Sequence, residues 1–507
     1  MQVQRTPFTA PKVTMWLWGS GTVADALMIQ TFGLIMPIFN TGFGLDAVLL
    51  SWALMLPRLI DGLFDPILGH ISDNAKTRWG RRKPFLVVST VLGALLITGI
   101  WWADPSWPAW VQFIYISVFA TMYYCTWGTY AMTHSALGFE LTDDYHERSR
   151  VAAIRTVYLQ IVVLIVSWTY WLALRPIFGG EIHGIRFITA VMAVLILISG
   201  MIPVLVCQER FATLNRTHVP MLRALKEALR LGAFRTYLAM RFFWALGLVL
   251  FTSISWYVNV YYVCRGDKQL ATKITGMATA IVVVGSVAIL PLVPRISRLI
   301  GKRYSIIAGA SLALLQACAM PLLLTPEMPY LQLLAALVFG PLVAIAIVMR
   351  DAIVPDICDL DELAHGQRRE ALFSAVISFV YKIEVSVCVL IVGYLVSFSG
   401  FDPKHIAQPA EVLTKLQWFA HLPNIVCALM ATLLAFRFPV TEKLMQEVRQ
   451  TLDRRHLSAA DTLAGVADTD DPRPRPPTSH ASTLPLTSAT ESQPSVAGDA
   501  MGVPAPR

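Results

Sequence analysis

Ionisable side chains interrupt stretches of the chain that are otherwise apolar, and these side chains are the ones best suited to chemistry. Asp61 and Asp65 are four residues apart, so a helix places both carboxylates on one face. Two ionised carboxylates at that spacing repel each other and need a proton, a cation or a basic neighbour. Arg58 and Lys382 are basic residues able to supply part of this compensation. The pattern predicts an oxygen-lined, titratable pocket that suits Na⁺ or H⁺.

Three more ionisable residues, Asp25, Arg155 and Glu384, stand in other apolar stretches. An ionisable group at mid-bilayer costs roughly 2.5–3.5 kcal/mol on insertion scales, so a membrane segment keeps few that it does not use. Structural ion pairing is the alternative for each of these charged residues. It is favoured for Glu384, which lies on a different helix face from Lys382, whereas a cation site is favoured for the Asp61 and Asp65 pair.

Aromatic residues recur in the same stretches, and we select Tyr123 and Trp127 among them as solute contacts. Aromatic rings stack on the C–H faces of sugars, and carboxylates accept hydrogen bonds from pairs of hydroxyls. Membrane-interface belts are also rich in Trp and Tyr, so packing in such a belt is the alternative for any single aromatic residue.

The elements that must hold these residues are predicted to be membrane-spanning helices. The chain has 507 residues, of which 55% are apolar and 15% charged, and its mean hydropathy is +0.57. Soluble proteins are about 25% charged, so this composition excludes an ordinary soluble enzyme and a disordered scaffold. The formal charge is +8, and we assign this basic excess to membrane topology rather than to nucleic-acid binding.

Twelve stretches are long and apolar enough to cross a bilayer core, which needs about 20 residues as a helix. The first is too long for the apolar core of a signal peptide, so we expect it to stay in the membrane. The spans are predicted near residues 16–39, 47–71, 85–103, 110–138, 151–174, 185–207, 235–263, 273–293, 305–325, 330–349, 371–399 and 416–437.

Lys and Arg are divided unevenly between the loops. With both termini in the cytoplasm, the five internal loops hold 19 basic residues and the six external loops about 6. Short cytoplasmic loops carry the basic excess in membrane proteins, so we expect cytoplasmic termini.

The longest internal loop, 208–234, divides the spans into two groups of six. Its leucines and basic residues predict an amphipathic surface helix, with a plain linker as the alternative. Similar charged loops recur in both halves, which indicates a duplicated transporter fold. We expect a cytoplasmic N-terminus at 1–15, six-helix bundles at 16–207 and 235–437, and a cytoplasmic tail at 438–507. From about residue 471 the tail is predicted to be disordered, because it is rich in Pro, Ser, Thr and Ala.

Other kinds of chemistry find no support in the sequence. The chain has no G-x-x-x-x-G-K-[ST] motif, so ATP-driven pumping is not indicated. Its seven cysteines form no C-x-x-C pair, and we expect them to be buried packing residues. No nucleophile or metal constellation favours an enzyme. We therefore expect no catalysis and no cofactor beyond a coupling ion.

Three sequence runs carry a family resemblance. The first run is Arg58-Leu-Ile-Asp61-Gly-Leu-Phe-Asp65-Pro66, which continues through Asp73 to Gly80-Arg81-Arg82-Lys83-Pro84. The second run is Glu140 to Arg148, followed by Arg155. The third run consists of Pro355-Asp356, Gly366 to Phe373, and Lys382. Together they resemble the glycoside–pentoside–hexuronide:cation symporters, the melibiose-permease branch of the major facilitator superfamily. The runs lie in both halves in the family's order, and the resemblance covers about residues 15–437.

The resemblance implies an all-α integral membrane protein with twelve transmembrane helices in two six-helix bundles, the major facilitator superfamily fold. It implies that Asp25 is a solute-binding acid and that Arg155 and Lys382 are basic residues lining a central cavity. It also implies that Asp61 and Asp65 bind the cation.

A cytoplasmic gate motif is implied by the same resemblance. Its matching residues here are Asp73, Gly80, Arg81 and Arg82, and charge pairs of this kind can lock two halves together and release them on tilting.

The sequence departs from the melibiose-type pattern at three positions. Ala24, Ala131 and Ser135 stand where those members carry a lysine, an acid and a stacking tryptophan. His134 lies beside these positions. We interpret it as a packed histidine, with a titrating group that favours protons as the alternative.

The resemblance implies a secondary active transporter that carries a sugar or glycoside together with H⁺ or Na⁺ by alternating access. The alternative is the same fold carrying a non-sugar solute, such as an organic anion or a lysolipid-like amphiphile. The expected partners are the solute and the lipid bilayer, without nucleic acid. We expect a monomer in the cell membrane, specifically a bacterial inner membrane.

Overall fold

The computed structural model describes residues 9–75, 77–142, 144–209, 221–366 and 369–469. Their secondary structure is helical, apart from one isolated antiparallel bridge between Thr9 and Thr142. Met1–Leu452 form one compact unit that holds every membrane helix, and Asp453–Arg507 form a second. The segment predicted to be disordered from about residue 471 lies outside the described residues.

The N-terminal half begins with a span that is broken into short helices. These are α1 (Lys12–Gly19), α2 (Gly21–Thr31), the 3₁₀ turn η1 (Phe32–Leu34) and α3 (Ile35–Thr41). Five longer helices follow, namely α4 (Ala47–Asn74), α5 (Lys83–Gly99), α6 (Ala109–Phe139), α7 (Tyr145–Ala173) and α8 (Glu181–Val206).

The C-terminal half contains six long helices. They are α10 (Gly232–Tyr257), which continues through the π-helical η4 (Val258–Val263), then α11 (Lys268–Ile289), α12 (Val293–Leu323), α13 (Gln332–His365), α14 (Glu370–Phe398) and α15 (Ala410–Phe436). Two further helices lie outside the spans: α9 (Met221–Ala228) falls in the central loop, where a surface helix was predicted, and α16 (Glu442–Thr469) follows α15.

Local signals in the sequence explain several helix ends. Asp46 caps α4 by accepting hydrogen bonds from the backbone N–H groups two and three residues later, at 2.9 and 3.1 Å. Asp267 caps α11 in the same way at 2.9 Å. Gly366 ends α13 with a φ of 72°, and Gly301 interrupts α12 with a φ of 80°, values that glycine adopts without a Cβ penalty.

Each of the twelve predicted spans falls on a long helix or on the broken first span, so the all-α membrane fold is confirmed. Ten of them are recognised as candidate spans by length and composition among the described residues. The other two, α4 and α6, have 28 and 31 residues and are long enough to cross a bilayer. The apolar content of α4 is lowered by Arg58 and Asp61, which line a cavity inside the protein. That of α6 is lowered by buried polar residues such as Gln112, Thr133 and His134.

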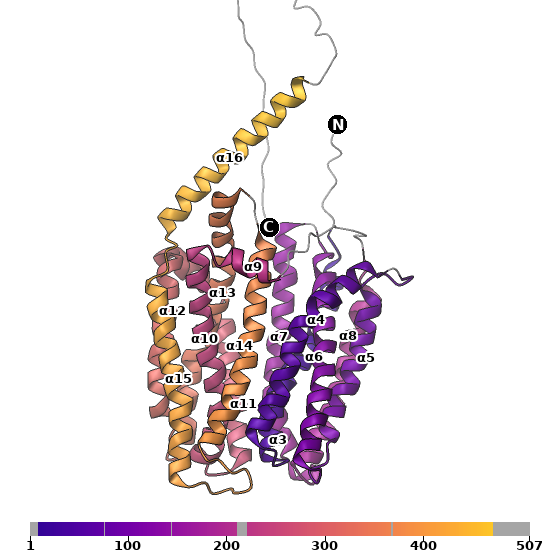
Figure 1. Cartoon of the computed structure of the whole chain (residues 1–507), viewed down its shortest axis with the longest axis vertical. Helices are drawn as coiled ribbons and strands as arrows, with labels where there is room; N and C mark the ends of the chain where they lie inside the picture. Colours follow the sequence, from indigo (N-terminus) through magenta and orange to yellow (C-terminus); the bar gives the residue numbers. More distant parts are fainter. Residues whose placement is uncertain (1–8, 76, 143, 210–220, 367–368, 470–507) are drawn as a thin grey trace, which may run out of the picture. The chain divides into compact units, whose positions relative to one another are not determined.

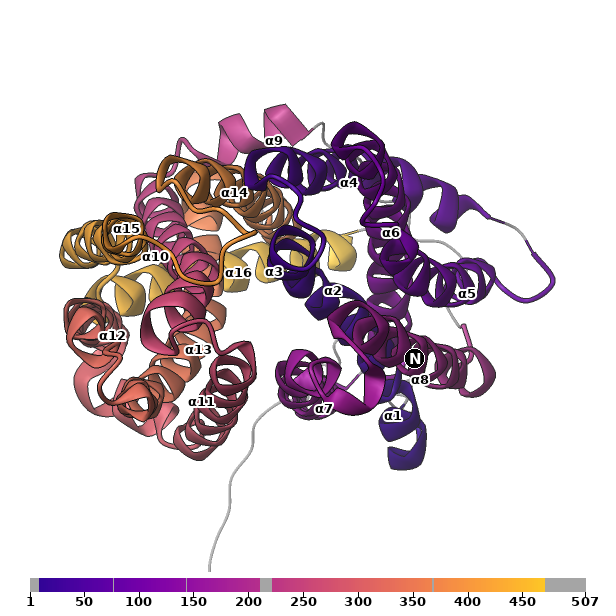
Figure 2. The same ribbon diagram turned by 90° about the horizontal axis from the view of Figure 1, so that it is seen from below.

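Helices α1–α8 form one group and α10–α15 form another, as the view along the helices shows (Figure 2). The two groups contact each other where α4 packs against α14 and where α7 packs against α11. Helix α9 lies at one end of this bundle (Figure 1), which we call the α9 end. The other end, where α3 turns into α4, is called the opposite end.

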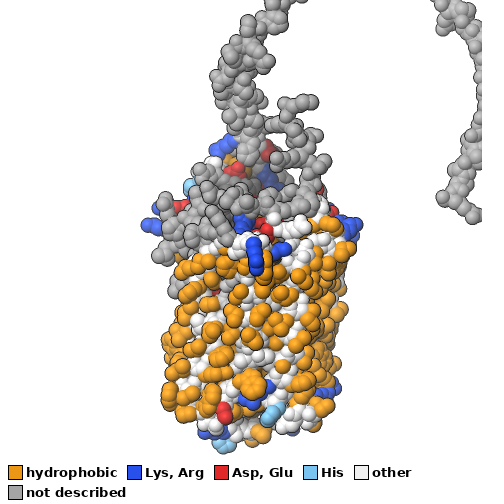
Figure 3. Space-filling model, turned by 90° about the vertical axis from the view of Figure 1, so that its right-hand side faces the viewer, with side chains coloured by type: hydrophobic (Ala, Val, Ile, Leu, Met, Phe, Trp, Pro, Cys, Tyr) orange, Lys and Arg blue, Asp and Glu red, His pale blue; other side chains and the backbone are white. Residues whose placement is uncertain are grey.

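The outer faces of the long helices are apolar. Large apolar side chains such as Leu95, Leu205 and Leu322 are more than half exposed. Figure 3 shows apolar side chains over most of one face of the bundle, whereas Lys, Arg, Asp and Glu gather near its two ends. An apolar surface this large is not stable in water, and it fits a bilayer core.

Candidate functional site

A cavity of about 1170 Å³ lies between the two halves. Its walls come mainly from α2, α4 and α6 on one side and from α10, α12, α13 and α14 on the other. It extends from the middle of the helices toward the α9 end, where Pro355 and Glu370 line it. Its lining includes the charged or aromatic residues Arg58, Asp61, Tyr124, Trp127, Arg241 and Lys382.

Asp61 and Lys382 join the two halves at the wall of this cavity. The Lys382 ammonium on α14 donates to Asp61 Oδ2 on α4 at 2.8 Å, and the Asp61 side chain is only 3% exposed. A buried carboxylate needs such a partner, because removing water from an ion is costly. The neighbouring Asp65 belongs to α4, but its side chain lies outside the described residues, so its role as a cation ligand stays a prediction.

Arg58 is held by an aromatic residue of the cavity. Its Nε donates a short hydrogen bond to the Tyr124 hydroxyl, and its guanidinium lies 5.1 Å from the centre of the same ring. Tyr124 also stacks on Phe32, with ring centres 3.8 Å apart. These contacts fix the guanidinium one helical turn from Asp61 at the cavity wall.

Asp25 and Arg155 form a second polar cluster beside the cavity. Trp127 Nε1 donates to Asp25 Oδ1 at 2.9 Å, and Arg155 donates to Asp25 Oδ2 at 3.2 Å. Asp25 is buried, whereas the Arg155 side chain is 42% exposed. Trp127 lines the cavity, so it connects this cluster with the cavity.

Two further residues of α6, Tyr123 and His134, have packing contacts in the structure. Tyr123 is buried away from the cavity lining, and its hydroxyl donates to the Met28 carbonyl at 3.0 Å. His134 is fully buried, stacks on Trp18 and bonds the Trp18 carbonyl through Nε2 at 3.0 Å. Because Nε2 must donate to that carbonyl, His134 is held in place by the same tryptophan that it stacks on.

The residues of the predicted gate motif lie at the α9 end between α4 and α5. Gly80 has a φ of 108°, and an added Cβ there would lie 2.7 Å from Glu209 Cδ. Arg81 and Arg82 donate to Glu140 at 3.1 and 2.6 Å, and both backbone N–H groups donate to Glu209. These contacts stay within the N-terminal half and the start of the central loop. The Asp73 side chain lies outside the described residues.

A matching network ties the C-terminal half together at the same end. Asp356 accepts from Lys302 at 2.6 Å and from Arg449 at 2.8 Å. Arg369 bonds Asp361 at 2.7 Å and Glu227 of α9 at 3.0 Å. The hydrogen bonds with Asp361 raise the pKa of Arg369, so this cation keeps its charge.

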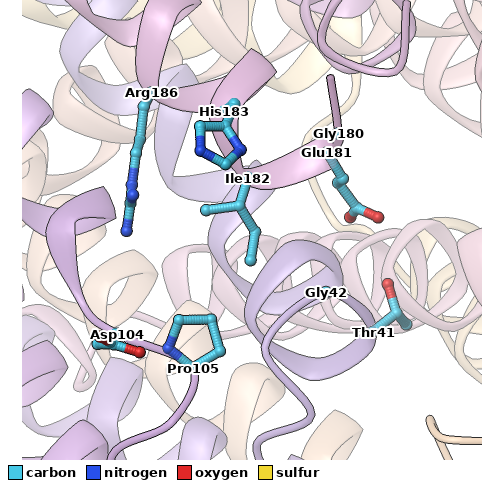
Figure 4. A pocket seen from close by; sticks show the side chains of 9 residues that line it. All are labelled: Thr41, Gly42, Asp104, Pro105, Gly180, Glu181, Ile182, His183 and Arg186. Atoms are coloured by element: carbon cyan, nitrogen blue, oxygen red, sulfur yellow. The ribbon is translucent and has the colours of Figure 1, made fainter. Parts of the chain in front are cut away.

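At the opposite end, polar contacts connect the two halves directly. Lys268 at the start of α11 donates to Glu181 at the start of α8 at 2.7 Å, and Gln269 donates to the Leu174 carbonyl at 2.8 Å. Tyr170 donates to the other Glu181 oxygen at 2.5 Å. Glu181 also lines a pocket of about 420 Å³, shown in Figure 4 with Asp104 and Arg186 across from it. The halves are joined here, whereas the central cavity lies toward the α9 end.

Among the residues of the cavity that were not predicted as site residues, Tyr124 and Arg241 stand out by their contacts or charge. Tyr124 holds Arg58, and Arg241 of α10 lines the cavity from the C-terminal half. Arg241 gave a usable signal, because it is an ionisable residue within an apolar span. The sequence offers no comparable means of choosing Tyr124 over Tyr123, since adjacent residues on a helix differ only in the direction they face.

Comparison with known proteins identifies relatives over most of the chain. A family model described as "MFS/sugar transport protein" matches residues 17–442. An uncharacterized symporter of Synechocystis sp. is 25% identical, with 87% of this chain and 96% of the relative covered. A glucuronide carrier protein homolog of Escherichia coli is 23% identical (86% and 94% covered), and a putative glycoside/cation symporter of the same species is 22% identical (89% and 96% covered).

Solved structures with a similar fold are also transporters. A mutant form of the nucleoside transporter NupG superposes with a TM-score of 0.61 at 12% identity, with 84% of this chain and 99% of that chain covered. A bacterial homolog of the human lysosomal transporter Spinster, in an inward-facing and occupied conformation, has a TM-score of 0.56 at 12% identity, with 85% and 97% covered. At this identity the likeness establishes the fold alone.

Proposed function

The chain belongs to the MFS/sugar transport protein family, and from this premise we propose that it carries a sugar or glycoside across the membrane together with H⁺ or Na⁺. The family agrees with the resemblance to glycoside–pentoside–hexuronide:cation symporters drawn from the motifs. The relatives are named as symporters and sugar carriers, which favours secondary active transport over an enzyme and over a non-sugar solute.

One observation carries the coupling proposal. Asp61 is a buried acid at the cavity wall, and its partner Lys382 comes from the other half of the molecule. The ammonium occupies the position in which a proton or Na⁺ would neutralise the carboxylate. We infer that the coupling ion, held by Asp61 and Asp65, replaces Lys382 and so loosens the contact between α4 and α14.

The solute site is proposed to lie next to this cation site. Trp127 supplies an aromatic face in the cavity, and Asp25 behind it is an acceptor for sugar hydroxyls. Arg155 and the released Lys382 are donors to solute oxygens. Ion binding then favours solute binding, and linkage requires that the solute strengthens ion binding by the same factor.

The proposal also assigns the orientation of the protein in the membrane. We propose that the α9 end and both termini face the cytoplasm of a bacterial cell, with the chain in its cytoplasmic membrane, because the loops predicted on this side hold most of the loop Lys and Arg. The polar contacts around Glu181 then close the external side, and the cavity extends toward the cytoplasm. The structure is therefore interpreted as an inward-facing state of an alternating-access carrier.

The test is transport by the full-length protein in liposomes under imposed Na⁺ and H⁺ gradients, with a panel of glycosides, pentosides, uronides and lysolipids. Wild type should accumulate at least one of these sugars against its gradient. The double variant Asp61→Asn, Asp65→Asn should lose gradient-driven accumulation while still exchanging solute across the membrane, because neutral amides no longer need an ion.

A matched control uses an acid away from the cavity. Glu411 on α15 is exposed and pairs only with Lys415 among its described ion pairs, so Glu411→Gln should transport like wild type. Full accumulation by the Asp61, Asp65 double variant would refute the cation site. Accumulation of amphiphiles but no sugar by wild type would refute the proposed substrate class.

A further inference from the structure

Glu384 is a buried acid for which the proposed symport cycle has no use. Its side chain is fully buried on α14, and neither carboxylate oxygen has a hydrogen bond of ordinary geometry among the described residues, although the backbone of Leu246 on α10 lies near the carboxylate. The nearest described cation is Arg241 of α10, whose Nη1 lies 4.0 Å from Glu384 Oε2. That Nη1 atom is also buried without a described hydrogen-bond partner. The two groups are close, but they do not bond each other.

An ionised carboxylate fits this position poorly. Burial removes the water that stabilises an ion, and an ion pair offsets that loss only with good geometry and further hydrogen bonds. The Glu384 carboxylate and the Arg241 guanidinium are 4.0 Å apart and do not hydrogen-bond each other, so this pair meets neither condition. The neutral, protonated carboxyl is therefore the form that this arrangement accommodates at the lower desolvation cost.

The groups that face Glu384 come from several helices. Arg241 approaches from α10 and the Cys427 thiol from α15, while Cys388 lies one turn along α14 with Arg58 of α4 beyond it. Lys382, two residues before Glu384, binds Asp61 instead. Arg241 also lines the central cavity and lies over the Tyr381 ring, so it links Glu384 with the cavity.

We propose that Glu384 is a proton-binding site of the carrier, separate from Asp61 and Asp65, with Arg241 as its counter-charge; this rests on the proposed symport function. On release, the carboxyl O–H bond breaks, the proton passes to water in the cavity, and the electron pair stays on the carboxylate. Arg241 then moves into hydrogen-bonding distance of Glu384. On protonation Arg241 is freed for acceptor groups of a solute in the cavity.

Transport provides the first test. Glu384→Gln keeps the shape of the side chain and fixes it in a neutral form, and Glu411→Gln is the matched control. In liposomes we expect Glu384→Gln to lose proton-driven accumulation of sugar by about tenfold or more, the usual range of coupling between two ligands, while exchange continues. Unchanged proton-driven accumulation in Glu384→Gln, or wild-type transport that responds only to Na⁺, overturns the proposal. Failure of wild type under both gradients instead contradicts the symport function.

A second readout does not depend on transport. In purified full-length protein, the infrared carbonyl-stretch band of protonated carboxyls should contain a component that changes with pH in wild type and is missing from the spectra of Glu384→Gln, so that it appears in the difference between the two proteins. Arg241→Gln removes the counter-charge, so the band should then persist across the pH range, which keeps the test open if Glu384→Gln misfolds. A pH-dependent band that neither substitution alters overturns the proposal.

Discussion

At the scale of single residues, the structure pairs charges that the sequence places far apart. Asp61 and Lys382 stand in different halves, yet their side chains meet at 2.8 Å. Removing one partner of a buried ion pair leaves an uncompensated charge, which lowers the free energy of unfolding by about 3–5 kcal/mol. The partial exposure of Lys382 favours the lower end of that range.

Lys382→Gln is therefore expected to lower the Tm of the purified protein, because Asp61 keeps its charge and loses its ammonium partner. The double variant Asp61→Asn, Lys382→Gln should recover most of that loss, since neither charge then remains buried. Thermal unfolding followed by fluorescence measures both effects. A double variant less stable than Lys382→Gln alone would show that the pair is not the source of the effect.

Trp127 offers a second residue-scale test, because its indole combines an aromatic face with a hydrogen bond to Asp25. Trp127→Phe keeps a ring but removes the N–H donor. A hydrogen bond to a charged group contributes about 1.5–3 kcal/mol, so we expect the KM for sugar uptake to rise roughly tenfold or more. Trp110→Phe, at an exposed site, is the control that should leave KM unchanged. An unaltered KM in Trp127→Phe would show that Asp25 is not part of the solute site.

Much of this site was predictable from residue types, and the remainder depended on the direction in which side chains point. Asp61, Lys382 and Trp127 were predicted, and each lines the cavity. Tyr123 was selected as a solute contact, but Tyr124 is the tyrosine that lines the cavity, because neither composition nor spacing says which of two adjacent residues faces it. The Asp25–Arg155 contact joins α2 and α7, and only the packing of those helices brings it about.

At the scale of helices, the spans were predictable because bilayer thickness sets their length, whereas their continuation beyond the membrane was not. Helix α13 extends to His365, well past the predicted span near 330–349. Its polar extension is stabilised outside the lipid by ion pairs such as Lys302–Asp356 and Arg369–Asp361. Hydropathy contains no information about such pairs, so it ends the helix at the membrane surface.

The crossing of α4 and α14 gives an element-scale prediction. A Cβ at Gly393 would overlap the Ser51 side chain and lie 2.6 Å from the Ala47 carbonyl oxygen. Gly393→Val is therefore expected to push the helices apart and to destabilise the protein by about 1–3 kcal/mol, measured as a lower Tm together with reduced uptake. Gly232→Ala, where no atom lies within 4 Å, is the control. Wild-type stability in Gly393→Val would mean that the helices do not approach this closely.

At the scale of the whole molecule, the two ends of the bundle differ in how they join the halves. The described ion pairs at the α9 end connect elements within one half or with the central loop, whereas Lys268 and Glu181 connect one half to the other. Alternating access requires the contact at the opposite end to break when the cavity opens to that side. The Lys268–Glu181 pair is thus the natural target for shifting the balance between the two states.

Reversal of these charges tests that idea. Glu181→Lys and Lys268→Glu each place like charges together, so each single variant should favour the state open at the opposite end. A partly exposed ion pair contributes about 1 kcal/mol, so its loss should shift the equilibrium between the two states by roughly fivefold. The reporter is Thr275→Cys, which lines a pocket of about 250 Å³ beside the cavity toward that end. Its labelling by an impermeant maleimide added outside should accelerate in both single variants.

The double reversal restores an attractive pair with its polarity exchanged, so labelling of Thr275→Cys should return to the wild-type rate if the contact acts through charge. Glu411→Lys, at an exposed pair on α15, controls for the general effect of added charge and should not alter the rate. If labelling stays fast in the double reversal, the opposite end is closed mainly by the hydrogen bonds of Tyr170 and Gln269. The charge reversal disturbs these hydrogen bonds, and restoring the ion pair does not restore them. Slow labelling in all three reversal variants would show that the halves are held together at this end by apolar packing between α7 and α11.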